Sequence, residues 1–298
     1  MQRRVAVLAV LALLAVLSGC SAAGSIELQS LTDADLAAEA SRTADPAAPD
    51  HAVTNRSRAD VVSAAVEHGS VTVAGVRPPI SDGLPFAAGG GYYDLSWAVV
   101  ANRTAHTVDI GITYGDSAPN GTAVDYEDLP AADRAALSRL LPPREGAPTD
   151  DTIGVSVVYS DADLRESVLA PTQRYDAVVF EGQRYALTVE APRAVTVATY
   201  RYTATEVAPN TSAYVSHLES AYAFTLSGLS GSERSVVESA RDDTYYADST
   251  DDEAFATLVD RFRAHEAIQD DGDYGTWLIT YEGERYLVDL SYRSFVDQ

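Results

Sequence analysis

The sequence predicts an α+β fold made of tandem repeats of about 100 residues. Leu31, Leu129 and Leu229 are spaced by 98 and 100 residues, and each follows a short segment of alternating apolar residues. After each leucine, a Thr, Pro or Ser with an acidic residue three positions later indicates the start of a helix. A hairpin signature, Glu-Gly-x-Arg-Tyr, recurs at residues 181–185 and 282–286. Strands and helices grouped in this way favour α+β over a parallel sheet.

Each repeat is expected to contain a strand, two helices, a β-hairpin and one extra strand. The predicted repeats span residues 26–114, 122–207 and 220–298, and the first is divergent because it lacks the Glu-Gly-x-Arg-Tyr turn. The joints between them share Ala-Pro-Asn and are typical of exposed turns. The alternative is that three similar helix starts occur by coincidence within one α+β domain.

Helix signals are clearest in the third repeat. Ser230 and Glu233 have the spacing of a capping box, of which Thr32 and Asp35 are a weaker version. The second helices of the three repeats are predicted to begin near Ser57, Asp161 and Asp251. The last of them has its apolar residues at a helical period, namely Phe255, Leu258, Val259 and Phe262.

Residues 1–19 are predicted to be a lipoprotein signal peptide. Two arginines precede an apolar run of 13 residues, which is shorter than the roughly 17–25 residues of a membrane-spanning helix. Leu-Ser-Gly-Cys at residues 17–20 then has the form of a lipobox, in which Cys20 receives the lipid. Cys20 is the only cysteine, so no disulfide can form within the chain, and residues 20–25 serve as a short tether. The alternative is an N-terminal anchor helix that contains a cysteine by chance.

The charge balance limits the choice of partners. The chain has 44 acidic residues against 21 cationic ones, all of them arginine, and removal of residues 1–19 leaves a net charge of −25. Nucleic acid is excluded as a partner because phosphate binding needs a basic surface. The same negative charge argues against electrostatic adhesion to anionic lipids. Attachment to the membrane must therefore come from the lipid on Cys20, at the extracellular face of the cell membrane. Other envelope proteins and surface glycans are further candidate partners.

The helix starts, the Glu-Gly-x-Arg-Tyr hairpins and the acidic, lysine-free composition together resemble a known group of proteins. They are similar to the small α+β repeat domains, of no established activity, in cell-surface lipoproteins of halophilic archaea. The resemblance covers most of residues 26–298 and implies a surface location but no chemistry. A lipoprotein of a GC-rich Gram-positive bacterium is the alternative source.

All four asparagines of the chain lie in the sequence Asn-x-Ser/Thr, without proline at x. This pattern makes them candidate N-glycosylation sites, and surface turns of polar composition are the alternative explanation. The four residues are Asn55, Asn102, Asn120 and Asn210.

No catalytic residue, cofactor or metal site is predicted. The five histidines form no helical ligand pair, and no nucleophile elbow or phosphate-binding glycine loop occurs. The acidic run at residues 270–273 lacks the spacing of a calcium-binding EF-hand loop. The sequence thus favours a non-enzymatic scaffold or binding module. A cell-envelope hydrolase using Asp/Glu carboxylates and a solute-binding lipoprotein are the alternatives.

Overall fold

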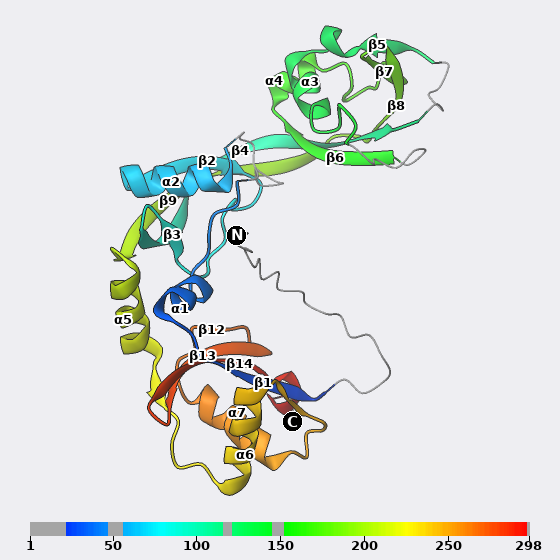
Figure 1. Ribbon diagram of the computed structural model, residues 1–298. Coiled ribbons are helices and arrows are strands. Elements are labelled where there is room, and N and C mark those ends of the chain that lie inside the picture. Colours follow the sequence, from blue (N-terminus) through cyan, green and yellow to red (C-terminus); the bar gives the residue numbers. More distant parts are fainter. Residues whose placement is uncertain (1–21, 47–55, 116–120, 145–151, 297–298) are drawn as a thin grey trace, which may run out of the picture. The chain divides into compact units, whose positions relative to one another are not determined.

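The computed structural model describes residues 22–46, 56–115, 121–144 and 152–296, and the chain forms two compact units. The terminal unit combines the chain up to Ala40 with the chain from Ala208 onward, and the central unit comprises Ser41–Val207. Across the described residues there are eight α-helices and two sheets that mix parallel and antiparallel pairs (Figure 1). The predicted α+β class is therefore confirmed.

A six-stranded sheet with the order β10-β13-β14-β1-β11, in which β12 pairs with β13, is the frame of the terminal unit. Its strands are β1 (Gly24–Gln29), β10 (Phe224–Thr225), β11 (Tyr245–Ala247), β12 (Gln269–Asp270), β13 (Tyr274–Tyr281) and β14 (Glu284–Ser291). The predicted hairpin is present between β13 and β14. Its turn places Glu282 at φ 52° and Gly283 at φ 85°, a conformation that glycine adopts without steric cost.

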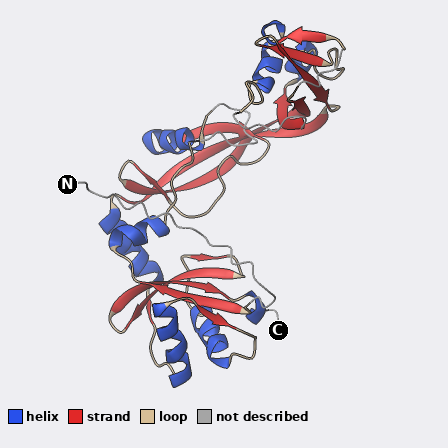
Figure 2. Cartoon of the chain, turned by 45° about the vertical axis from the view of Figure 1, so that its right-hand side comes forward, coloured by secondary structure: helices blue, strands red, loops and turns tan. Residues whose placement is uncertain are grey.

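The helices described in the terminal unit are α1 (Asp33–Glu39), α5 (Thr211–Tyr222), α6 (Gly231–Asp242), α7 (Glu253–Arg263) and α8 (Arg293–Val296), and two of them, α6 and α7, cover one face of this sheet (Figure 2). Figure 2 shows α6 and α7 together on one side of the strands. Phe255, Leu258 and Phe262 of α7 lie in one hydrophobic core with Trp277 of β13, and all four side chains are fully buried. The helical period predicted for α7 is confirmed.

The central unit has an eight-stranded sheet with the order β2-β9-β4-β8-β7-β5, and β3 and β6 also pair with β4. The strands are β2 (Ser70–Gly75), β3 (Phe86–Ala88), β4 (Gly91–Thr113), β5 (Ala123–Asp125), β6 (Thr152–Tyr159), β7 (Ala177–Phe180), β8 (Gln183–Val189) and β9 (Arg193–Ala208). The helices are α2 (Arg58–His68), α3 (Ala131–Leu137) and α4 (Asp161–Glu166), with a short 3-10 helix at Tyr126–Asp128.

In the described part of the central unit, β4 contributes to two hydrophobic cores. Near its start, Leu95 packs in a core with α2, β2 and β9, where Val61 and Tyr202 are completely buried. Near its end, Val108 and Ile110 pack in a second core with α3 and the β7–β8 hairpin. Between these two cores, β4 is exposed from residue 96 to residue 104.

Four of the described helices begin with a capping box. The side chain of the capping residue accepts a hydrogen bond from the backbone amide three residues later, and the side chain of that later residue accepts one from the amide of the capping residue. The capping residues are Thr32, Ser57, Ser160 and Ser230. The predicted starts at Thr32 and Ser230 are confirmed, and the second helices begin within two residues of their predicted positions.

The structure divides the chain differently from the three predicted repeats, which it does not confirm. Most of β1 and all of β2 lie in the predicted first repeat. β1 pairs with β14 of the predicted third repeat, with Ile26 opposite Leu290. β2 pairs with β9 of the predicted second repeat, with Val73 opposite Tyr200. The local pattern specifies where a helix starts and which face of a strand is buried. It does not specify which strand is the neighbour, because alternation is the same for every partner.

Two segments nevertheless have the same local connectivity. In the central unit, β5 pairs in parallel with β7, with Val124 opposite Val178, three residues before Glu181 of the hairpin turn. In the terminal unit, β10 pairs in parallel with β13, with Phe224 opposite Ile279, again three residues before the turn residue, here Glu282. In both segments the short strand is followed by a helix and the hairpin comes later.

Candidate functional site

The carboxylates most shielded from water stabilise the fold. Among the described acidic residues only Asp133 and Glu233 are buried. Asp133 accepts hydrogen bonds from the Tyr159 hydroxyl at 2.9 Å, from the Ser167 hydroxyl at 2.8 Å and from the Val168 amide at 2.9 Å. Burial, and then Asp133 itself, raises the pKa of Tyr159. Because Asp133 is buried and its carboxylate accepts three hydrogen bonds from other parts of the fold, its role is structural.

Glu233 occupies the corresponding place in the terminal unit. It accepts from the Ser230 amide at 2.7 Å and from Arg261 Nε at 2.6 Å. Its pKa is lowered, first by the hydrogen bond from the Ser230 backbone and further by Arg261, because both favour the charged carboxylate. This carboxylate ties the start of α6 to α7.

The sequence-predicted sites are only partly within the described residues. Cys20, Asn55 and Asn120 lie outside them. Asn102 is exposed on β4. Asn210 is exposed at the start of α5, where its Oδ1 accepts from the Ala213 amide at 2.9 Å and caps the helix. Asn102 belongs to the central unit and Asn210 to the terminal unit.

The acidic run at residues 270–273 forms a turn between β12 and β13. Asp271 accepts from the backbone amides of Asp273 and Tyr274 at 3.0 Å and 2.8 Å, which lowers its pKa. Asp270 accepts from the Gly272 amide at 2.8 Å. These bonds stabilise the turn. No group of three or more His, Cys, Asp or Glu side chains able to hold a metal ion occurs in the described residues.

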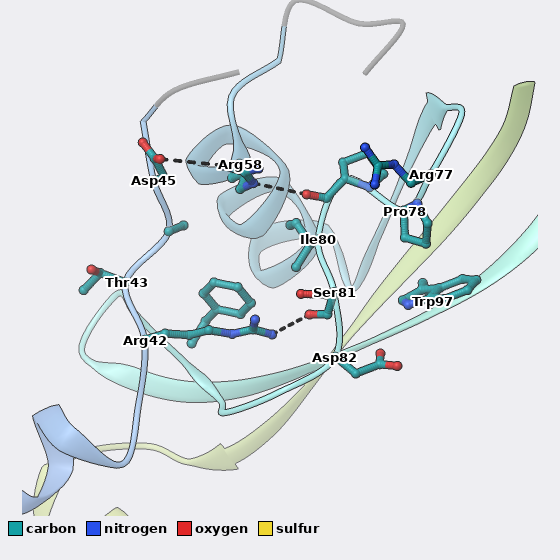
Figure 3. A pocket seen from close by; sticks show the side chains of 13 residues that line it. Arg42, Thr43, Asp45, Arg58, Arg77, Pro78, Ile80, Ser81, Asp82 and Trp97 are labelled. Atoms are coloured by element: carbon teal, nitrogen blue, oxygen red, sulfur yellow. Dashed lines mark hydrogen bonds and ion pairs between the residues drawn. The ribbon is translucent and has the colours of Figure 1, made fainter. Parts of the chain in front are cut away.

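A pocket of about 660 Å³ in the central unit gathers cationic and aromatic side chains (Figure 3). We call it the arginine pocket, since its walls include Arg42, Arg58 and Arg77. Phe86, Trp97 and the loop at residues 77–82 complete the part of the wall that concerns its chemistry. The three arginines come from the segment before α2, from α2 itself and from the loop after β2.

Three side chains hold the loop at residues 77–82 by its backbone. The Tyr202 hydroxyl on β9 donates to the Ile80 carbonyl and accepts from the Ile80 amide, both at 2.9 Å. Arg58 Nε donates to the Pro79 carbonyl at 3.2 Å, and an amino group of Arg42 donates to the Ser81 carbonyl at 2.8 Å. Tyr202 is fully buried, and burial raises its pKa to about 12. The loop is therefore fixed at three consecutive residues.

Arg42 keeps unused donor capacity at the pocket wall. Its guanidinium lies 4.1 Å from the centre of the Phe86 ring, a cation–π contact. Its Nε is buried and has no hydrogen-bond partner among the described residues. Desolvation lowers the pKa of Arg42, while Asp82 and Asp94 act in the opposite direction. Because a guanidinium remains protonated in proteins, the wall carries a positive charge with an unsatisfied N–H.

Arg77 and Trp97 are exposed members of the pocket wall. Arg77 is exposed, and its side chain forms no hydrogen bond or ion pair with any described residue. Trp97 is 36% exposed, and its ring meets that of Tyr200 edge-to-face with the centroids 5.3 Å apart. Arg58 also faces Asp45, at 3.6 Å. An available guanidinium and an indole in the wall of one pocket can together bind a planar anion that also has an apolar face.

No linear pattern in the sequence predicts the arginine pocket. Arg42, Arg58 and Arg77 are separated by 16 and 19 residues and lie on three different elements, so no linear motif joins them. The one local hint is that Arg77 precedes two prolines, which stiffen the loop that carries it. The position of that loop depends on Tyr202, 122 residues from Ile80.

In the part of the chain that the structure describes, no helix has the length and apolar character needed to cross a lipid bilayer. No protein-family model, curated protein or solved structure matches the chain.

Proposed function

We propose that this protein is an exported, lipid-anchored surface protein that acts as a non-enzymatic binding module, with the arginine pocket as its ligand site. The lipobox at residues 17–20 and the apolar run before it support export and attachment through Cys20. The acidic, lysine-free composition supports an origin in a halophilic archaeon, where molar salt screens the repulsion between like charges.

The observation that carries the binding role is the inversion of charge at the pocket. In a chain of net charge −23, the described residues that line this one cavity include three arginines and two acidic residues. Its volume of about 660 Å³ is within the range of roughly 300–1,000 Å³ typical of small-molecule sites. Arginine pairs bidentately with carboxylate and sulfate groups. We therefore infer that the ligand is an anionic sugar, whose apolar ring face packs on Trp97.

The alternatives named from the sequence, an envelope hydrolase and a solute-binding lipoprotein, stay predictions. The arginine pocket favours binding over hydrolysis because its acids face cations instead of each other. Asp45 forms an ion pair with Arg58, and the negative charge of Asp82 raises the pKa of Arg42. A glycosidase needs two carboxylates placed on either side of one bond.

We also propose that residues 122–207 and 220–298 derive from one repeated unit. The parallel β5–β7 and β10–β13 pairs, each three residues before a Glu-Gly turn, support this origin. So do the buried acids Asp133 and Glu233, which occupy matching positions after Leu129 and Leu229.

The binding role is tested by titrating the protein with trigalacturonate, with a sulfated trisaccharide and with fully methyl-esterified trigalacturonate. Binding is followed by tryptophan fluorescence, because Trp97 is accessible and Trp277 is fully buried. The anionic probes should bind, and Arg77→Gln should weaken them about tenfold or more, since hydrogen bonds to charged groups contribute about 1.5–3 kcal/mol. The esterified probe should bind weakly to both forms.

Arg139→Gln is the matched control, because Arg139 is exposed near α3 and lines no part of the pocket. Equal affinity of the anionic and esterified probes, or equal weakening by Arg139→Gln, would contradict an anionic ligand. The preference between the carboxylated and the sulfated probe identifies the acid group. Anchoring is tested separately, since Cys20→Ser should release the protein from the membrane fraction.

A further inference from the structure

One stretch of β4 is exposed on both faces. Residues 96–104 are all exposed, although strands in a packed sheet ordinarily alternate between buried and exposed positions. Three of these residues have large apolar side chains, and Trp97, Val99 and Val100 are 36%, 46% and 45% exposed. Apolar side chains gathered on an accessible strand favour contact with another molecule.

The same stretch has an open edge among the described strands. β3 pairs with β4 as far as Tyr93, and the pairings with β6 and β8 begin at His106 and Ile110. In between, β9 is the one remaining neighbour of β4. A strand with a single neighbour presents a row of free N–H and C=O groups, to which a strand of another chain can add.

Charge does little to protect this edge. Proteins commonly place several charged residues on an open strand to prevent pairing, but residues 95–104 contain one charged side chain, Arg103. In the rest of the chain the high negative charge opposes association, but molar salt screens that repulsion at distances beyond about 3 Å.

The sequence Asn102-Arg103-Thr104 lies within the open stretch, and the side chains of Asn102 and Thr104 are both exposed. Successive side chains of a strand point to opposite faces. Asn102 therefore shares a face with Val100, while Trp97 and Val99 lie on the other. A sugar on Asn102 covers Val100 and leaves Trp97 free at the arginine pocket.

We propose that Asn102 carries an N-linked glycan that closes the open edge of β4 against a second copy of the chain. In the transfer, the Asn102 amide nitrogen forms a bond to the anomeric carbon of a sugar held by a lipid-linked phosphate donor. The bond between that carbon and the phosphate oxygen breaks, the phosphate leaves with the electron pair, and the amide proton goes to solvent. The glycan then occupies the space that an added strand would need. The inference requires export but not a ligand in the arginine pocket.

The test compares Thr104→Val with Thr104→Ser in the full-length protein, isolated from cells that N-glycosylate exported proteins. Both changes are small and suit a strand, but only Thr104→Val destroys the acceptor sequence. Peptide mass spectrometry should find the glycan on Asn102 in the wild type and in Thr104→Ser, and not in Thr104→Val. Light scattering should show that the association constant of Thr104→Val is about tenfold or more higher.

A second change locates the contact. Val100→Lys, added to Thr104→Val, should return the protein to the monomer, because a charge on the exposed strand opposes pairing. The proposal is overturned if Asn102 is unmodified in the wild type. It is equally overturned if Thr104→Val is as monomeric as Thr104→Ser, or if Val100→Lys leaves its association unchanged.

Discussion

The guanidinium of Arg285 on β14 donates to the carboxylate of Asp33 on α1 at 2.6 Å, although the two residues are 252 positions apart. A second amino group of Arg285 donates to Glu219 on α5, also at 2.6 Å, and Arg285 reaches the Leu31 carbonyl at 3.3 Å. One side chain thus joins α1 and α5 to the hairpin formed by β13 and β14.

Arg285→Gln should lower the free energy of unfolding of the terminal unit by about 1–2 kcal/mol, because two carboxylates and a carbonyl lose their donor at once. The loss should be larger in dilute buffer than in molar salt, where the charges are screened. Arg293→Gln is the control, since it removes the same charge from a side chain that is 72% exposed. Urea unfolding of the three proteins at two salt concentrations measures the difference, and equal losses for both variants would contradict the prediction.

Tyr202→Phe should release the loop at residues 77–82. The hydroxyl satisfies both backbone groups of Ile80 in a buried position, so its removal should cost about 1–3 kcal/mol of stability. Binding of trigalacturonate should weaken as well, because Arg77 then loses its fixed position. Tyr246→Phe is the control, since Tyr246 is 60% exposed. Thermal unfolding and the fluorescence titration give the two readouts, and unchanged affinity in Tyr202→Phe would argue that the loop is held by Arg42 and Arg58 alone.

Acid should weaken the contact of Glu233 with Ser230 and Arg261. The pKa of Glu233 is lowered in the folded protein, so its contribution is fully present above the unfolded pKa of about 4.3 and is lost as pH falls through the folded value. The stability of the wild type should therefore fall more between about pH 5 and pH 3 than that of Glu233→Gln. Glu266→Gln, which removes an exposed carboxylate, should follow the wild type. Identical pH profiles for wild type and Glu233→Gln would contradict this assignment.

The terminal unit should not fold from residues 208–298 alone. That fragment lacks β1, which pairs with β14 on one side and β11 on the other and buries Ile26 and Leu28 in the core. A synthetic peptide of residues 22–40 should restore the fold when added in trans at high salt. The same peptide with Ile26→Asp should fail, because a charge cannot be buried there without a partner. Circular dichroism monitors both additions, and a fragment that folds unaided would refute the role of β1.

Salt should stabilise the whole protein. Since 44 acidic residues face 21 arginines, screening removes more repulsion than attraction. The melting temperature should rise between about 0.1 M and 2 M NaCl, as the Debye length falls from about 10 Å to below 3 Å. A flat melting temperature over this range would favour the Gram-positive alternative over a halophilic archaeon.

The sequence predicts the local structure well because local interactions produce it. The capping pairs Thr32–Asp35 and Ser230–Glu233 each lie within one turn of helix, and both are present. The hairpin at Glu282 and Gly283 likewise depends on the φ preferences of two adjacent residues. Such features need no knowledge of the rest of the fold.

Partners far apart in the chain are not predictable in the same way. The alternation of Ile26 and Leu28 indicates a half-buried strand, but nothing near it specifies Leu290 as the opposite residue. The arginine pocket is hidden for the same reason. Arg77 and Trp97 both line it, and the loop that carries Arg77 is held in part by Tyr202 on a distant strand.

The place of β1 has a consequence for the order in which the protein can mature. The terminal unit cannot complete its sheet until β14 has been synthesised, because β1 pairs with this strand, which ends at Ser291. The strands of the central unit all lie between Ser70 and Ala208, so that unit can form its sheet while the C-terminal segment is still being synthesised. The first strand in the sequence, β1, is thus among the first segments to be made and among the last to gain its place in a sheet.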